Sequence, residues 1–160
     1  MKIIKSIVDE SLKEKFSNAD WANDLIQFAT YKCEIDGLLA AGNLFCPELI
    51  IIDDFVFIKQ FWKYENEEES MKSLNILKTQ FNNNKKEIEI FVNSCPIGEL
   101  FLGKKSDEMD DEDILNQFGN MLCFFWKERL KMVFPNRIFI VSLINDFDGE
   151  IGSCIVLYEN

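Results

Sequence analysis

The feature that most limits the fold of this chain is a long segment, residues 111 to 134, whose apolar side chains recur with the period of an α-helix. Acidic residues begin the segment, basic residues lie near its end, and both positions interact favourably with a helix dipole. Pro135 then ends it, and the apolar face is wide enough to require cover from other elements. We therefore predict a central core helix. Its apolar face comprises Ile114, Leu115, Phe118, Met121, Leu122, Phe125, Trp126, Leu130 and Val133.

A β-hairpin is predicted by "IIIDDFVFIKQFW", residues 50 to 62, which places two adjacent aspartates inside a strongly apolar stretch. The β-rich runs 48–52 and 55–61 are separated by only two residues, which is the loop length of a tight hairpin. The alternative is that Asp53 and Asp54 bind a cation. Mg²⁺ and Ca²⁺ prefer about six or more oxygen ligands, and the sequence identifies no further ligands, so we favour the turn.

A second hairpin is predicted over residues 138 to 158, with its turn at Asp148-Gly149. The segment "NDFDGEIGS" has the composition of a calcium loop. Counted from Asp146 as the first ligand, however, the first glycine comes at the fourth position instead of the sixth, and Leu157 stands where the bidentate glutamate is needed. We therefore interpret this segment as a turn.

Helical spacing also recurs near residues 3–16, 21–29 and 66–80, and Trp21 and Trp126 fall on the apolar faces. The segment "KKEIEIFVNSCP" fits a helix with Ile88, Phe91 and Val92 inward or a strand, and we favour the helix. The fold class expected is α+β. An antiparallel sheet from two hairpins, about 48–61 and 138–158, packs against several helices, and residues 1–160 form one domain.

The chain contains no histidine, and this absence excludes much familiar chemistry. Ser-His and Cys-His nucleophile pairs need histidine, as do the zinc sites that combine histidine with cysteine or carboxylate ligands. The seven glycines form no phosphate-binding motif, and the five cysteines show no short paired spacing. We therefore expect no catalytic residues, no metal site and no cofactor.

The net charge is −11, from 28 acidic residues against 17 basic ones. Binding to DNA or RNA requires clustered Lys and Arg, so nucleic acid is not an expected partner. The sequence has no apolar stretch long enough to span a membrane and no signal-type amino terminus. We expect a soluble, cytoplasmic protein that does not bind membranes.

The run "DEMDDED", residues 107–113, is the first candidate binding feature, because it can attract a basic protein. Its alternative role is a solvated helix start, with Asp110 or Asp111 as the cap. A second acidic segment, residues 65–69, follows the aromatic residues at the exit of the first hairpin, which can anchor a partner. The candidate partner-binding residues are Trp62, Tyr64, Glu67, Glu68, Asp107, Glu108, Asp110, Asp111 and Asp113.

The segments "LFCPELIIIDDFVFIKQFW" and "FVNSCPIGELF" resemble those of a group of small bacterial cytoplasmic proteins without an established chemistry, over roughly residues 38 to 160. In size, acidity and lack of catalytic groups the chain is also similar to immunity proteins that neutralise secreted toxins. We therefore predict a non-enzymatic acidic interaction domain, specifically an immunity- or antitoxin-like inhibitor of a basic partner protein. Two alternatives stay open: a small-ligand-binding or carboxylate-based enzyme domain, and a subunit of a bacterial assembly, such as a homodimer.

Overall fold

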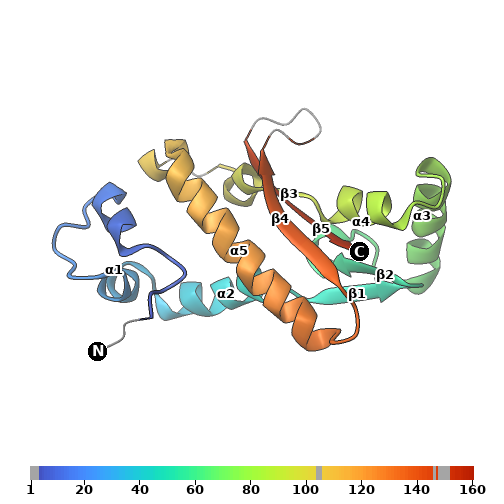
Figure 1. Cartoon of the computed structure of the whole chain (residues 1–160), viewed down its shortest axis with the longest axis horizontal. Helices are drawn as coiled ribbons and strands as arrows, with labels where there is room; N and C mark the ends of the chain where they lie inside the picture. Colours follow the sequence, from blue (N-terminus) through green and yellow to red (C-terminus); the bar gives the residue numbers. More distant parts are fainter. Residues whose placement is uncertain (1–3, 104–105, 146, 148–151) are drawn as a thin grey trace.

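The long central helix is present in the computed structural model, which describes residues 4–103, 106–145, 147 and 152–160. Helix α5 (Glu112–Val133) begins after Asp111, whose side chain accepts hydrogen bonds from the backbone N–H groups of Asp113 and Ile114. The helix buries Leu122, Trp126 and Leu130, and it crosses the molecule diagonally in Figure 1. The predicted core helix and its aspartate cap are confirmed.

Both predicted hairpins form, and the fold is α+β. Strands β1 (Leu49–Ile52) and β2 (Phe55–Ile58) pair antiparallel in a two-stranded sheet. Strands β3 (Cys95–Pro96), β5 (Ser153–Glu159) and β4 (Phe139–Asn145) form a second antiparallel sheet, in that order. The two hairpins therefore lie in separate sheets rather than in the single sheet that we predicted. The predicted turn at Asp148-Gly149 lies outside the described residues.

Two buried polar side chains of helix α4 (Lys85–Asn93) explain why the sheets stay separate. The Glu89 carboxylate accepts the backbone N–H of Val56 on β2 at 3.0 Å and that of Glu159 on β5 at 2.7 Å. The Asn93 amide accepts the N–H of Ile58 at 2.9 Å and donates to the carbonyls of Val56, at 3.0 Å, and Leu157, at 3.3 Å. Desolvation by burial raises the pKa of Glu89. These two side chains take the place of a strand between β2 and β5, because they satisfy backbone groups that an added strand would otherwise pair.

Strand β2 lies between two apolar clusters, and all four of its residues are buried. Val56 and Ile58 pack with α5 and the three-stranded sheet. Phe55 and Phe57 lie on the other face, in a cluster with side chains of α3 (Glu67–Gln80) and α4. The helical interpretation of "KKEIEIFVNSCP" is confirmed, but α4 buries Ile88 together with Glu89 and Asn93 and leaves Phe91 exposed.

The amino-terminal elements form an arm at the left of Figure 1, away from α3 and α4. The arm consists of η1 (Glu10–Lys15), α1 (Leu25–Lys32) and α2 (Ile35–Phe45), so its helices are shorter and later than predicted. Three further short helices are η2 (Lys59–Phe61), η3 (Ile97–Phe101) and η4 (Asp107–Asp110). Among the described residues, no helix combines the length and apolarity needed to cross a bilayer.

Residues 53 and 54 form the two-residue turn of the first hairpin, as predicted. Asp53 has a φ of 57° and pairs with Lys78 at 2.6 Å. Replacement of Asp53 by asparagine should lower the free energy of unfolding by less than about 1 kcal/mol, because exposed ion pairs contribute little and asparagine tolerates this conformation. Replacement by valine should cost about 1–2 kcal/mol more, because a β-branched residue is strained at positive φ.

Urea denaturation of both variants measures the two costs. An asparagine variant as destabilised as the valine variant would show that the Asp53 carboxylate, and not its backbone conformation, supports the turn.

Candidate functional site

The acidic run 107–113 is partly used within the molecule. Lys15 contacts Asp111 at 3.0 Å and Asp113 at 2.6 Å, and these contacts lower the pKa of Asp111. The backbone N–H of Ser17 donates to the Glu108 carboxylate at 2.9 Å and is the main cause that lowers the pKa of Glu108 to about 2. Three of these carboxylates therefore hold the amino-terminal segment against the start of α5.

The other three carboxylates of the run, Asp107, Asp110 and Glu112, are exposed and make no ion pair with the described residues. They precede α5 or lie in its first turn, where negative charge is favourable to the helix dipole. They are therefore free to attract a basic partner without loss of an internal contact.

The prediction of an exposed aromatic anchor at Trp62 is wrong. Trp62 is only 5% exposed, its ring stacks on Phe57 at 4.8 Å, and its indole N–H donates to the buried Ser70 hydroxyl at 3.0 Å. The side chain is buried because the chain turns after β2 and lays the indole on the aromatic face of the first sheet. Tyr64 is exposed, as are Glu67 and Glu68, which lie in the first turn of α3.

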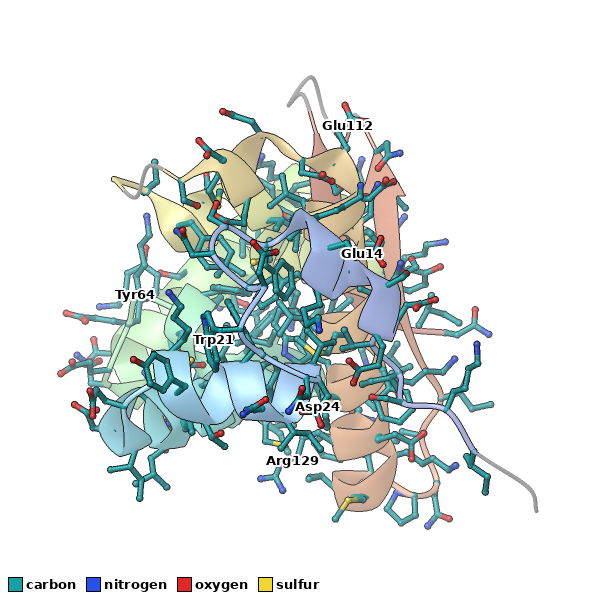
Figure 2. All side chains as sticks on the ribbon, turned by 90° about the vertical axis from the view of Figure 1, so that its left-hand side faces the viewer. Glu14, Trp21, Asp24, Tyr64, Glu112 and Arg129 are labelled. Atoms are coloured by element: carbon teal, nitrogen blue, oxygen red, sulfur yellow. The ribbon has the colours of Figure 1, made fainter. Side chains whose placement is uncertain are left out.

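The structure does not bring the two predicted acidic segments together. In Figure 2, Tyr64 lies toward the left of the molecule and Glu112 at its top, with Glu14 below Glu112 and Trp21 to the right of Tyr64. Glu68 also pairs with Lys72 along α3, at 2.6 Å. A partner that uses the run at 107–113 will therefore meet the arm before it meets Tyr64.

The exposed aromatic side chains lie instead in the arm. Trp21 is one of them, although its helical periodicity predicted a core residue. Trp21 is 42% exposed and Tyr31 is 74% exposed, and their ring centroids lie 4.5 Å apart. Phe28 stacks against Trp21, with the two ring centroids 6.0 Å apart. The indole N–H of Trp21 donates to the carbonyl of Asn18 at 2.7 Å, and this bond fixes the orientation of the partly exposed ring.

The arm and the acidic run lie on one face, on which Glu14, Trp21, Asp24 and Glu112 appear together in Figure 2, with Arg129 near Asp24. The described residues 4–36 and 106–113 contain thirteen acidic side chains and four basic ones. Two of those four lysines are already engaged, since Lys13 donates to the carbonyls of Ala22 and Asn23 and Lys15 binds the acidic run. Aromatic rings set among carboxylates are suited to lysine or arginine side chains.

We call this region the arm surface and define it by its exposed aromatic and acidic side chains. Its members are Glu14, Asp20, Trp21, Asp24, Tyr31, Asp107, Asp110 and Glu112. The carboxylates that flank Trp21 in the sequence, Asp20 and Asp24, were a signal of exposure that helical periodicity alone does not register.

The chain matches no family model, no curated protein and no solved structure. Within the part of the chain that the structure describes, no three His, Cys, Asp or Glu side chains gather in a group that could hold a metal ion.

Proposed function

We propose that this protein is a non-enzymatic interaction domain that binds a basic partner protein through the arm surface. The observation that carries the proposal is the exposed pair of Trp21 and Tyr31, 4.5 Å apart, on a face with a large excess of carboxylates. Trp and Tyr are, with Arg, the residues most enriched among those that dominate binding energy.

The two kinds of side chain have different roles in such binding. Carboxylates such as Asp107, Asp110 and Glu112 raise the rate at which a cationic partner meets the surface, because long-range attraction acts mainly on encounter. Tyr31 and Trp21 act after contact, because their rings bury apolar area and accept Lys or Arg cations over their faces. The proposed surface therefore combines fast association with slow dissociation.

The specific form that we propose is an inhibitor of a basic protein, as in pairs of an immunity protein or antitoxin with its toxin. Such inhibitors commonly use an acidic face to reach a cationic target quickly, and they need no catalytic group of their own. The arm surface has this chemistry, and the absence of histidine from the chain is compatible with it.

The proposal predicts distinct kinetic effects for acidic and aromatic substitutions. The combined change Asp107→Asn, Asp110→Asn and Glu112→Gln should slow association about tenfold at low salt and weaken its salt dependence, with little change in dissociation. Tyr31→Ala should speed dissociation about tenfold or more, because an exposed aromatic anchor contributes after contact. Asp111 and Asp113 are left intact because they hold Lys15.

The measurement is affinity capture from a native-cell lysate at low salt, followed by surface-based kinetics on the captured protein. The matched control is Glu68→Gln, Glu69→Gln and Glu87→Gln. It changes the net charge of the protein by the same amount as the first triple variant, but on α3 and α4 instead of at the arm surface. Capture of a protein that is not basic, or equal effects of the two triple variants on association, would contradict a role for the arm surface.

A further inference from the structure

Strand β1 is an edge strand without the usual protection of such edges. It pairs only with β2, and in Figure 1 none of the described elements runs along its other side. Natural edges are commonly protected by lysine, proline or a bulge. The four residues Leu49–Ile52 contain none of these, and Ile51 is 51% exposed.

The register of the hairpin shows which backbone groups of β1 point outward. Lys59 N–H donates to the Glu48 carbonyl at 2.9 Å, so the hydrogen-bonded pairs of this antiparallel ladder continue at Ile50 and Ile52. The N–H and C=O groups of Leu49 and Ile51 therefore point away from β2. No hydrogen bond from another described residue reaches these outward groups.

The two edges of this sheet therefore differ. On the β2 edge, Glu89 and Asn93 bond the outward N–H groups of Val56 and Ile58 and the carbonyl of Val56. On the β1 edge, the corresponding groups remain available to an added strand, which is a recurrent way for a protein to bind an extended peptide.

A hollow beside the β1 edge adds side-chain chemistry to this backbone edge. It has a volume of about 260 Å³ and is lined by residues 50–53 of β1 and its turn, residues 65–67, Ser70 and Met71. Its apolar wall comes mainly from the isoleucines of β1. Glu65 and Glu67 contribute exposed carboxylates that make no ion pair with the described residues, whereas Asp53 is already paired with Lys78.

We infer that the open edge of β1 binds an extended basic segment of a partner protein, which adds to the sheet as a third strand. The outward groups of Leu49 and Ile51 would pair with the backbone of that segment. Its cationic side chains would meet Glu65 and Glu67, and its apolar side chains would contact the exposed face of Ile51.

Charge decides between this occupant and a second copy of the chain. Glu48 stands before β1, and Asp53 and Asp54 follow it. Both aspartates are already paired with lysines, so repulsion at the strand ends is small, but a second β1 strand brings no cation to Glu65 and Glu67, because residues 48–54 contain no Lys or Arg. A strand with lysine or arginine at alternate positions instead forms opposite-charge pairs. This inference does not rest on the arm surface, because it concerns a different part of the molecule and is tested separately.

The probe for this edge is a labelled seven-residue peptide of alternating Lys and Val, with blocked ends, in fluorescence anisotropy measurements. Its matched control carries N-methyl groups on alternate residues, which removes the N–H donors of one edge and keeps the charge. We expect the N-methylated peptide to bind the unmodified protein at least about tenfold more weakly, because the added ladder is lost. A peptide of alternating Glu and Val should not bind measurably.

In the protein, Ile51→Pro removes an N–H that points outward but removes no hydrogen bond of the β1–β2 ladder. Edge strands accept proline at such positions. Ile51→Pro should weaken binding of the Lys-Val peptide at least about tenfold, whereas Ile51→Thr, which keeps the N–H, should change it less than threefold. Equal binding of the plain and N-methylated peptides would overturn the proposal, and this readout does not depend on how the proline variant folds. Sedimentation that shows a dimer of the unmodified protein, dissociated by Ile51→Pro, would assign the edge to a second copy instead.

Discussion

Replacement of Trp126 by alanine is expected to lower the free energy of unfolding by about 3–5 kcal/mol, as is typical when a buried large aromatic side chain is truncated. Trp126 is 2% exposed and lies in the cluster that joins α5 to both sheets. Its ring meets Phe61 edge-on at 6.3 Å, and its indole N–H donates to the Leu44 carbonyl of α2 at 2.8 Å. The substitution therefore opens a void and also releases the hydrogen bond that ties α2 to the core.

The void would adjoin a hollow of about 220 Å³ that Trp126 already helps to line with Phe61 and Leu44. The neighbouring side chains therefore cannot simply close around the alanine, which places the expected cost toward the upper part of the range. Urea denaturation measures it, with Phe124→Ala as the control, because Phe124 is an exposed aromatic residue on the same helix. Equal destabilisation by the two substitutions would show that the core does not depend on Trp126.

The elements that could be predicted are those whose signal is local and repeated. Helix α5 carries its apolar period over six turns, and the first hairpin has two apolar runs separated by a two-residue turn. Such patterns identify a helix or a hairpin because every apolar side chain of the segment indicates the same secondary structure. The pairing of the two hairpins carries no comparable signal, and there the prediction of a single sheet was wrong.

Glu89 and Asn93 show why the sequence did not predict that the two hairpins lie in separate sheets. In a helix, a glutamate and an asparagine four residues apart normally indicate a solvated face, so the sequence pattern favoured Ile88, Phe91 and Val92 as the inward residues. The structure buries the polar pair because the strands on either side leave backbone groups that only polar side chains can satisfy. That need arises from the tertiary arrangement and is invisible in any short window of sequence.

The candidate site was predicted only in part for a related reason. The run 107–113 was correctly identified as an acidic feature of the start of α5, but its internal contacts with Lys15 and Ser17 join segments far apart in the chain. Trp21 and Trp62 exchanged their expected environments. Trp62 has the aromatic face of a sheet to cover, whereas Trp21 lies on a short arm with only Phe28, Tyr31 and their neighbours to contact.

The largest polar effect is expected for Asn93→Ala, which should lower the free energy of unfolding by about 3–6 kcal/mol. The change leaves the N–H of Ile58 and the carbonyls of Val56 and Leu157 buried without their partner, and each unsatisfied buried group costs about 1–3 kcal/mol. Truncation of an exposed asparagine should cost less than about 0.5 kcal/mol, so Asn75→Ala on α3 is the matched control.

The combination of Asn93→Ala with Glu89→Ala tests whether the two side chains act together as the substitute for a strand between β2 and β5. Both bond the backbone of Val56, one at its N–H and the other at its carbonyl, and each also reaches β5. Once one side chain is lost and the strands separate, water can reach the groups that the other had satisfied, so the second loss should cost less than it does alone. A double-mutant cycle from urea denaturation should therefore give a coupling energy of about 1–3 kcal/mol, within the range found for residues in one network. Additive costs, within about 0.5 kcal/mol, would mean that Glu89 and Asn93 support the two strands independently and that another contact joins the sheets.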